Sequence, residues 1–502
     1  MAITDRQILT IVDPNISEGD GGKIKLRNLA IENTEDEKAA DAPPVGEKIS
    51  SIIGQQIPYV KINTNKIEGE DLLQFVLDIN GFIPKVRIVL KDNNQKFANM
   101  DFPKDGDVIS VYIRPKLIEE QKKVRCDFDI LSTNVSPGVG PEDAPTFTFS
   151  GILSVPGLFA EGIEGFAKDT SYNHLISVCE SLGLGFASNE DSTIDEMIRL
   201  RAAETPEKFI NDTTESCWKD ENSFFTSYID QWYNLCFVNL NKQFSEEKEY
   251  EQFPMSRSPI SNYENDVVKG EEPLEVGDFF LTNNPDFQGY DNYVINYGLK
   301  NESASVWMSE GYKRYCQYYD LEINEFISEF VDPLTTEGSE QELILPKGKA
   351  GDDFYEIQEK FKYLGKQEND NDESEGNVHL NYNFAKIHNY QNKREISKMQ
   401  LFVELDSTNF NLYRYQRIPL DIYSNHAVQS QLLSKKDDLI GNEGDEENTS
   451  DKNTDGMYRN EFFSGFYVLE GYSYIYNRGK EMTVKLNLVR REWPIPGESF
   501  DN

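Results

Sequence analysis

The sequence predicts an α+β protein that is mainly β, with two β-rich parts flanking a mixed, partly helical centre. Apolar and polar residues alternate in several segments between residues 58 and 158, and again after about residue 400, which is typical of half-buried antiparallel strands. Between Ser171 and Leu240 the apolar spacing changes to that of helices. Aromatic residues make up 12% of the chain, which suits strands and argues against a disordered protein.

Residues 1–55 lack sustained periodicity, so we expect an extended arm there. Residues 56–165 form the first β-rich part, with turn signals at residues 91–94 and 103–106 between its strands. Leu72, Phe75, Val76 and Ile79 recur at helical spacing and predict a short helix within it. The alternation that predicts its strands comes from Val60, Ile62, Thr64, Val86, Ile88, Leu90, Val124, Cys126, Phe128, Ile130, Phe147 and Phe149.

Residues 166–245 form the helical or mixed domain. The first expected helix contains Tyr172, Leu175, Ile176, Cys179 and Leu182, and it ends where Gly183 and Gly185 allow the backbone to turn. A second begins at the N-cap Thr205 with Pro206 in its first position and carries Phe209, Ile210 and Thr213 on one face. A third, capped by Asn222 or Ser223, contains Phe224, Phe225, Tyr228, Ile229 and Trp232, and a strand follows at Cys236–Leu240.

The rest of the chain divides into three parts. Residues 246–275 are an acidic insertion, and residues 276–365 are a central mixed region with strands near residues 279–282, 291–297 and 312–320, and a short helix at residues 322–330. Residues 366–502 are a second β-rich part with acidic loops at residues 368–375 and 437–455. Its alternation is carried by Leu401, Val403, Leu405, Met482, Val484, Leu486 and Leu488.

The negative charge of the chain limits which molecules its surface can bind. Fifty basic against 88 acidic residues give a formal net charge of -38, so the surface repels nucleic acid and anionic lipid, and tight DNA binding is not expected. Acidic walls would let DNA slide through a passage without sticking, but the charge is equally explained by solubility alone. No apolar run approaches the roughly 20 residues that cross a bilayer, so we expect no membrane anchor and assembly in a cytoplasm.

Candidate metal and catalytic residues are few. Asp451, Asn453 and Asp455 alternate like the ligands of a calcium loop, but the closing glutamate is one position early, and an acidic surface loop explains them as well. Cys126, Cys179, Cys217, Cys236 and Cys316 are scattered and are interpreted as reduced core residues. We interpret His174 as lying on the polar side of the first helix, and His379 and His388 as lying in a strand-and-loop region.

No motif of an esterase, a metalloprotease or a nucleotide-binding loop is present. Because the chain has 88 acidic residues, the sequence does not single out any pair of them as the catalytic carboxylates of a glycan hydrolase. We therefore expect no catalysis and no cofactor. Arg490, Arg491 and Trp493 follow a strong strand, and Arg and Trp favour interface anchors, although edge packing explains them equally. Tyr315 and Tyr318 are either interface or core aromatics.

Five segments together resemble the central baseplate hub proteins of contractile phage tails and related injection machines. The resemblance covers roughly residues 55–500, and no single motif in it is diagnostic alone. The segments are Gly-Leu-Gly-Phe-Ala-Ser-Asn (183–189), Tyr-Ile-Asp-Gln-Trp (228–232), Gly-Tyr-Lys-Arg-Tyr-Cys-Gln-Tyr-Tyr-Asp (311–320), Phe-Val-Asp-Pro-Leu-Thr-Thr (330–336) and Arg-Arg-Glu-Trp-Pro-Ile-Pro (490–496).

The resemblance implies two tail-tube-like antiparallel β-barrels with a small helical or mixed domain between them. It implies a structural hub in the virion tail baseplate, in which a homotrimer joins the hexameric tail tube to the trimeric central spike and lines the channel for genome ejection. Tape-measure protein and then DNA would pass without specific binding. The long N-terminal arm and the acidic insertions depart from the family, and because charged loops match buried surfaces poorly, we expect them outside the ring, in contact with surrounding baseplate wedge proteins. The alternative is a receptor- or glycan-binding β-protein at a virion surface, since Tyr and Trp stack on sugars.

Overall fold

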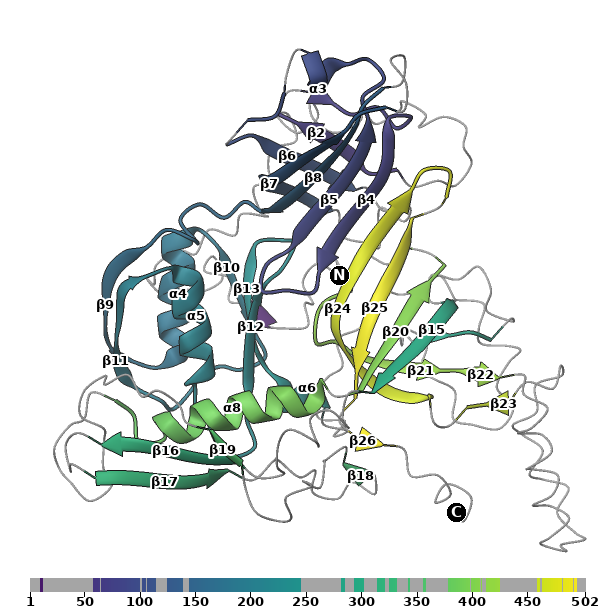
Figure 1. The fold of residues 1–502 in the computed structure, drawn as a ribbon. Helices are drawn as coiled ribbons and strands as arrows, with labels where there is room; N and C mark the ends of the chain where they lie inside the picture. The colour runs from purple at the N-terminus through teal and green to yellow at the C-terminus, as the bar shows by residue number, and fades with distance from the viewer. Residues whose placement is uncertain are drawn as a thin grey trace, which may run out of the picture.

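The computed structural model contains a large β-sheet, a helical domain beside it and several short sheets (Figure 1). The residues that it describes are 10–11, 57–63, 65–99, 102–104, 106–113, 124–138, 144–244, 281–284, 293–301, 314–320, 325–331, 342–343, 355–357, 378–397, 399–406, 408, 412–424, 458–460, 463–480, 482–490 and 492–493. Within these residues no helix is both long enough and apolar enough to span a membrane.

The N-terminal module is a group of antiparallel strands in the order β4-β5-β8-β7-β6-β2-β3. Its alternating residues point one set of side chains into the core, where the Phe147 and Phe149 rings stack with centroids 5.8 Å apart. A short helix, α3 (Lys96–Asn99), adds Phe97 to them. The strands are β2 (Tyr59–Ile62), β3 (Asn65–Lys66), β4 (Leu72–Ile79), β5 (Lys85–Lys91), β6 (Val108–Ile113), β7 (Val124–Ser136) and β8 (Thr146–Leu153).

The C-terminal module has the strand order β15-β20-β25-β24, with β21 on the first part of β24 and β14 beside β21. It is assembled from distant parts of the chain. The strands are β14 (Leu281–Thr282), β15 (Val294–Asn301), β20 (Met399–Leu405), β21 (Arg417–Asp421), β24 (Gly465–Asn477) and β25 (Thr483–Val489).

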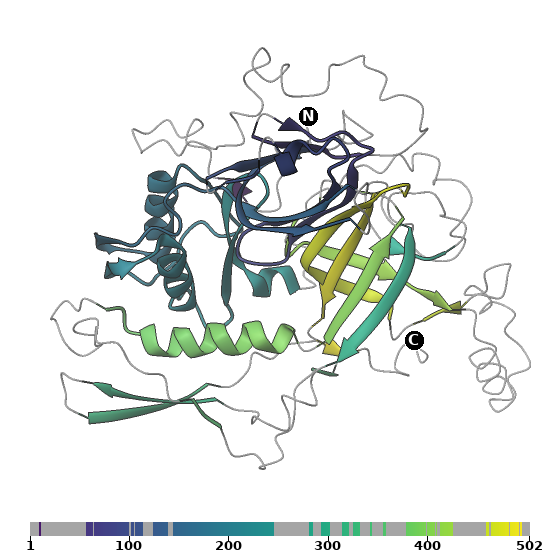
Figure 2. The same ribbon diagram turned by 45° about the horizontal axis from the view of Figure 1, so that its top comes forward.

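The two modules belong to one sheet of thirteen strands, because β24 of the C-terminal module pairs antiparallel with β4 of the N-terminal module. Figure 2 shows the modules side by side with β24 and β4 between them. The mainly β, antiparallel architecture is confirmed. The described strands differ from the expected pair of barrels in forming one open sheet, since an edge of each module is used to pair with the other.

The central domain lies against the N-terminal module and contains a four-stranded sheet in the order β1-β10-β13-β12. Two helices cover this sheet, as expected: α4 (Ser171–Leu182) and α5 (Pro206–Glu215). Thr205 caps α5 and Gly183 ends α4 with a φ of 66°, which glycine adopts without strain. The strands are β1 (Thr10–Ile11), β10 (Gly185–Ser188), β12 (Phe225–Ile229) and β13 (Asn234–Asn239), and a short helix α6 (Leu240–Phe244) follows.

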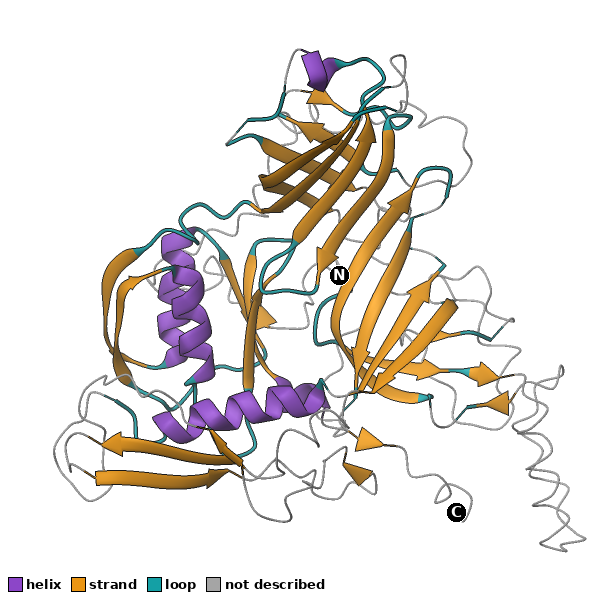
Figure 3. Cartoon of the chain, in the orientation of Figure 1, coloured by secondary structure: helices purple, strands orange, loops and turns teal. Residues whose placement is uncertain are grey.

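Further elements lie beside the central domain and the C-terminal module. A two-stranded ribbon of β9 (Gly162–Asp169) and β11 (Met197–Glu204) lies beside α4 and α5, and the long helix α8 (Tyr382–Ile396) crosses below them (Figure 3). The remaining described strands form small sheets. They contain β16 (Arg314–Asp320), β17 (Glu325–Val331), β18 (Glu342–Leu343), β19 (Tyr355–Ile357), β22 (Tyr423–Ser424), β23 (Tyr458–Arg459) and β26 (Glu492–Trp493).

Three predicted helices are strands, so these predictions were wrong. Residues 72–79 form β4, which is buried on one face and half-buried on the other, so apolar residues occur on both sides. Residues 225–229 form β12, which is almost entirely buried and whose two polar residues, Thr226 and Ser227, are adjacent, so the strand shows no alternation. Residues 325–331 form β17, which pairs residue for residue with β16 from Arg314 to Asp320.

Two histidine assignments were also wrong. His174 is buried, and its Nε2 lies 2.9 Å from the carbonyl oxygen of Ala167, because the β9 strand covers that side of α4. His388 lies in the helix α8 and not in a strand or loop, and its Nε2 lies 3.2 Å from the carbonyl oxygen of Ser223. His379 is buried as well, with Nε2 3.0 Å from the carbonyl oxygen of Ser216.

Candidate assembly site

The seam, as we call the pairing of β24 with β4, joins the modules through residues 472–477 and 74–79. Its core side is made of large apolar pairs: Tyr472 with Ile79, Tyr474 with Leu77, and Tyr476 with Phe75, all buried. Such cross-strand aromatic pairs are the unit of sheet stabilisation. The two modules are therefore joined like neighbouring strands of one core and not like two loosely touching domains.

The opposite side of the seam is polar. The Ser473 hydroxyl donates to Asp78 Oδ1 at 2.8 Å, and Gln74 Nε2 donates to Asn477 Oδ1 at 3.1 Å. Each such hydrogen bond contributes only about 1 kcal/mol net. Their greater effect is to fix the register, since a slip by one residue would exchange the polar and apolar faces of β24.

Gly471 makes the close approach at the end of the seam possible. It lies at an irregularity in the pairing of β24 with β25, where residue 470 is skipped. A Cβ atom on Gly471 would lie 2.9 Å from the Cα of Asn80, closer than real Cβ contacts occur. The turn after β4 therefore reaches β24 only because residue 471 has no side chain.

The segment Tyr228–Trp232, which the sequence resemblance singled out, forms the end of β12 and the tight turn to β13. Asp230 holds this turn. Its Oδ1 accepts from the amides of Trp232 and Asn234, both at 2.8 Å, and its Oδ2 accepts from Asn234 Nδ2 at 2.9 Å. Tyr233 adopts a φ of 63°, a left-handed conformation that the surrounding bonds maintain.

This turn contacts both modules at once. Gln231 Nε2 donates to the Tyr472 hydroxyl of the seam at 2.9 Å, and the Tyr233 hydroxyl accepts from the amide of Asp127 in β7 at 3.0 Å. The amide of Ile229 donates to the carbonyl of Phe82, beyond β4, at 2.7 Å. The central domain therefore fixes the angle between the modules. It does so through residues 228–233, which we call the wedge.

Arg414 links the same three parts from the other side. Its Nε donates to the carbonyl of Glu470 in β24, and its Nη1 donates to the carbonyl of Gly81 after β4, both at 2.6 Å. Its guanidinium lies 4.6 Å from the ring centroid of Tyr228, and the Tyr228 hydroxyl donates to its carbonyl at 3.2 Å. No pattern in the sequence identified Arg414, because its partners are carbonyls and rings that are distant in the chain.

The buried tyrosine and cysteine side chains at this junction stay neutral at ordinary pH. Burial raises the pKa of Tyr228, Tyr472 and Tyr474 well above the usual tyrosine value. Burial likewise raises the pKa of Cys126 and Cys236, whose thiols lie beside the wedge. The Tyr472 hydroxyl keeps its proton and donates it to the carbonyl of Leu412 at 2.8 Å.

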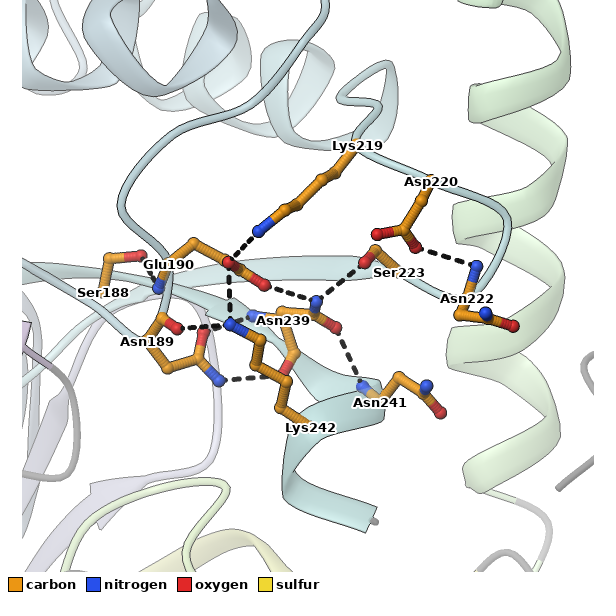
Figure 4. A network of polar contacts seen from close by, with 10 residues as sticks. All are labelled: Ser188, Asn189, Glu190, Lys219, Asp220, Asn222, Ser223, Asn239, Asn241 and Lys242. Atoms are coloured by element: carbon orange, nitrogen blue, oxygen red, sulfur yellow. Dashed lines mark hydrogen bonds and ion pairs between the residues drawn. The ribbon is translucent and has the colours of Figure 1, made fainter. Parts of the chain in front are cut away.

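A second polar cluster follows the Gly-Leu-Gly-Phe-Ala-Ser-Asn segment, centred on the buried carboxylate of Glu190 (Figure 4). Glu190 Oε2 lies 2.5 Å from Lys219 Nζ and 2.8 Å from Lys242 Nζ, and Asn239 Nδ2 donates to Oε1 at 2.7 Å. Asn189 exchanges hydrogen bonds with the backbone of Asn239. The cluster ties β10 to β13 and to α6, so the segment has a structural explanation.

A third cluster lies under α4 and is centred on Asp195. The carboxylate accepts from the amides of Ser171 and Trp218, both at 3.1 Å, and from the Ser171 hydroxyl, while Arg199 Nη2 donates to that hydroxyl oxygen at 2.8 Å. Burial acts to raise the pKa of Asp195, but the charge of Arg199 and the hydroxyl donors outweigh it, so the pKa is lowered. Because Ser171 is the first residue of α4 and Arg199 lies in β11, these contacts link the two elements to each other.

The residues proposed from sequence as interface anchors are spread over the fold. Arg490 is buried; its Nη1 donates to the carbonyl of Ser464 at 3.3 Å and its guanidinium lies 5.3 Å from the Tyr467 ring centroid. Trp493 lies in β26 opposite Glu342. Tyr315 and Tyr318 lie in β16, a different sheet. Arg491 and the calcium-loop candidates Asp451, Asn453 and Asp455 lie outside the described residues.

The cysteine interpretation holds for the four thiols that the structure describes. Cys126, Cys179, Cys217 and Cys236 are buried and free. Among the described residues no group of three or more His, Cys, Asp or Glu side chains is arranged to hold a metal ion.

No protein-family model matches the chain, and no curated protein matches its sequence. Solved structures do match. A 43 kDa tail protein of prophage MuSo2 from Shewanella oneidensis has 10% identity and a TM-score of 0.48, over 87% of this chain and 98% of that one. A tail protein from Neisseria meningitidis has 8% identity and a TM-score of 0.47, over 87% and 97%.

A third match is the c3393 protein of E. coli, described as a component of the type VI secretion system that is structurally similar to the T4 bacteriophage tail proteins gp27 and gp5. It has 9% identity and a TM-score of 0.38, and the match covers 87% of this chain and 79% of that one. Two of these three structures are thus tail proteins, and the third is a secretion-system component described as similar to tail proteins.

Proposed function

We propose that this chain is the central hub of a contractile tail baseplate, in which three copies form a ring that joins a sixfold tube to a threefold spike. The observation that carries the proposal is the seam. One chain contains two β modules joined edge to edge in a single sheet, as two neighbouring subunits of a tube ring would be. Three such chains present six modules, so a threefold ring matches a sixfold neighbour.

The wedge supports the same proposal. An adapter must hold its two modules at a constant angle, because a ring closes only if each junction turns by the same amount. Gln231, Tyr233 and Arg414 are buried. Gln231 donates to Tyr472 of the seam, and Tyr233 accepts from the amide of Asp127 in the N-terminal module. Arg414 donates to the carbonyls of Glu470 in β24 and Gly81 after β4. Buried polar groups of this kind are costly to displace, which favours a single geometry.

The polar face of the sheet suits the wall of a passage. The six strands around the seam contain four basic and three acidic residues, none of them buried, so this face is nearly neutral: Lys85, Arg87, Lys91 and Lys485 against Asp78, Glu404 and Glu470. Between them lie hydroxyl and amide side chains such as Ser150 and Asn477. DNA and tape-measure protein would pass such a wall without binding it.

In this proposal the tail tube lies on one side of the ring, the central spike on the other, and baseplate wedge proteins outside it. In this proposal the chain has a structural and not a catalytic role, so an assay for peptidoglycan hydrolysis is expected to be negative. The alternative of a glycan-binding protein is less well supported, because the largest fully buried side chains include Tyr467, Tyr472, Tyr474 and Tyr476, which are used in the core and not exposed for stacking on sugars.

The test is the mass of the full chain in solution, measured by analytical ultracentrifugation at micromolar concentration, alone and with its proposed spike partner. We expect the mass of three chains, or of three chains with three spike chains. A chain that remains monomeric under both conditions would contradict the proposed ring.

A further inference from the structure

The turn after β4 contains Asn80 followed by Gly81, and this is the single Asn-Gly pair in the 502 residues of the chain. Both residues are exposed and lie between the end of β4 and the start of β5. The main-chain nitrogen that follows an asparagine can attack the side-chain amide carbon, and glycine hinders this attack least because it has no Cβ atom. Asn80 is therefore the asparagine of this chain whose amide is least shielded from its own backbone.

The reaction needs no reagent besides water. The Gly81 nitrogen loses its proton to solvent and forms a bond to Asn80 Cγ, and the Cγ–Nδ2 bond breaks as ammonia leaves with a proton from solvent. The product is a five-membered succinimide ring. Water that breaks the new N–Cγ bond leaves an ordinary aspartate. Water that breaks the original peptide bond leaves an iso-aspartate, in which the main chain runs through Cβ and Cγ.

The seam holds the Asn80 side chain. Asn80 Nδ2 donates to Ser473 Oγ in β24 at 3.1 Å and also to Asp78 Oδ1. The Ser473 hydroxyl in turn donates to the same Asp78 oxygen at 2.8 Å. While these hydrogen bonds are intact, the amide is held beside β24 and cannot rotate freely toward the Gly81 nitrogen.

The main chain of the turn is held from the other side. The Gly81 carbonyl accepts from Arg414 Nη1 at 2.6 Å, and the Phe82 carbonyl accepts from the amide of Ile229 in the wedge at 2.7 Å. The two peptide units that follow the Asn80-Gly81 bond are thus fixed to other parts of the chain. The contacts of the seam restrain the amide, and those of Arg414 and the wedge restrain the segment that carries the attacking nitrogen.

We propose that Asn80 is a site of spontaneous deamidation through a succinimide with Gly81, and that the closed junction between the two modules slows this reaction. The reacting groups become free to approach each other when the turn after β4 opens locally. The rate of deamidation therefore measures how often the seam opens at Ser473 in an otherwise folded chain. This inference does not depend on the proposed ring.

Deamidation weakens the junction that had protected the residue. The new carboxylate at position 80 faces Asp78 Oδ1 where an amide donated before, so a hydrogen bond is replaced by repulsion between like charges. An iso-aspartate also lengthens the main chain in a turn that already approaches β24 closely at Gly471. A deamidated chain is therefore expected to open its seam more readily than a fresh one.

The test follows the amide of Asn80 in the full chain during storage in a mildly alkaline buffer, folded and unfolded in urea. Trypsin, used at mildly acidic pH, cuts after Lys66 and Lys85 and releases residues 67–85, in which Asn80 is the single asparagine. Mass spectrometry detects the replacement of the amide nitrogen by oxygen, and chromatography separates aspartate from iso-aspartate. We expect both products in the unfolded wild type, and a rate in the folded chain that is lower by at least about fivefold, the equivalent of one hydrogen bond of about 1 kcal/mol.

Three variants separate the site from its protection. Gly81→Ala keeps the amide but hinders the attack in both states, and the residue fits because a Cβ at Gly81 would meet nothing closer than the Ile83 carbonyl oxygen at 3.8 Å. Ser473→Ala removes one bond to Asn80 and is expected to speed deamidation of the folded chain by about fivefold. Ser150→Ala, at a half-buried serine of β8, is the matched control and should keep the wild-type rate.

Thermal unfolding checks that each variant is folded before storage. If unfolded wild type keeps its amide as long as unfolded Gly81→Ala does, Asn80 is not a deamidation site. If folded and unfolded wild type react equally fast, or if folded Ser473→Ala reacts no faster than folded Ser150→Ala, the seam does not protect the residue. Each of these results would overturn the inference and leave the hub proposal untouched, because the rates are properties of the single chain.

Discussion

Single buried polar residues set the relative positions of the modules and the central domain. Gln231 and Arg414 each connect parts of the chain that are more than 180 residues apart, through hydrogen bonds of 2.9 Å and 2.6 Å. An apolar contact tolerates sliding, whereas a buried donor that loses its acceptor costs about 1–3 kcal/mol. These residues therefore specify one arrangement, which is the property that a ring subunit needs.

Gly471→Ala tests the close approach at the seam. The new Cβ would lie 2.9 Å from the Cα of Asn80, and since that neighbour is backbone it cannot rotate away. We expect the free energy of unfolding to fall by about 1–3 kcal/mol. The measurement is denaturant unfolding, with Gly165→Ala as the control, because a Cβ at Gly165 meets nothing within 4 Å. Equal stability of the two variants would show that the turn after β4 is not tightly packed on β24.

Asp195→Asn tests the charged cluster under α4. Because the pKa of Asp195 is lower in the folded chain than in the unfolded one, the unfolded chain takes up the proton first as the pH falls. Its contribution to stability is complete above the ordinary value of 3.8 and is lost as the pH falls through the lower folded value. At pH 7 the variant is expected to lose about 3–5 kcal/mol, because Arg199 stays buried without its partner.

Thermal unfolding from pH 7 down to about pH 3 measures this difference, which should shrink on acidification toward the ordinary Asp pKa. Asp191→Asn, at an exposed neighbouring position, is the matched control. A difference between Asp195→Asn and wild type that stays constant across the range would mean that the folded pKa of Asp195 is not lowered.

At the scale of elements, the sequence was sufficient where one face of a strand or helix meets water. The alternation in β5, β8, β20 and β25 and the caps of α4 and α5 predicted those elements correctly. Prediction from the sequence failed where both faces of a strand are covered by other parts of the protein. β12 and β13 are almost entirely buried, and in β12 the apolar residues then occur at helical as well as at strand spacings.

Long-range pairing also could not be predicted. Nothing in residues 72–79 or 472–477 indicates that the two segments are neighbours, because pairing depends on the whole sheet. The wedge segment was singled out by resemblance, but the prediction gave it a helix, and its contacts with Tyr472 and Asp127 became visible only in the fold. Arg414 had no sequence signal at all.

The helix α8 illustrates a further cause of failure, which is a buried helix face made of polar residues. Asn389 is fully buried: its Oδ1 accepts from the amide of Phe225 at 2.9 Å, and its Nδ2 donates to the carbonyls of Glu215 and Cys217. His388 and Asn392 are buried beside it. A pattern search for apolar periodicity does not find such a face.

Asn389→Ala tests the docking of α8 on the central domain. The variant loses three hydrogen bonds and leaves the amide of Phe225 buried without its acceptor, so we expect the free energy of unfolding to fall by about 2–4 kcal/mol. Asn389→Asp keeps the acceptor for Phe225 but loses both donated bonds, and it should be destabilised to a different degree. Denaturant unfolding measures both. An unchanged Asn389→Ala would show that α8 is held by other contacts.

For the whole molecule, the distribution of charge separates two roles of the surface. The formal charge of -38 is not carried by the strands around the seam, whose four basic and three acidic residues nearly cancel. The excess of acidic residues therefore lies elsewhere in the chain. A neutral sheet face can be shared between copies or can line a passage, while the acidic remainder keeps the chain soluble.

The central claim is that each chain supplies two joined modules to a closed ring. The most direct measurement is electron microscopy of the purified full-length assembly, with averaged end-on views and a count of chains from its mass. The account predicts a ring of three chains whose outline shows six similar lobes around an open centre. A ring with one lobe per chain, or particles without a central opening, would contradict it.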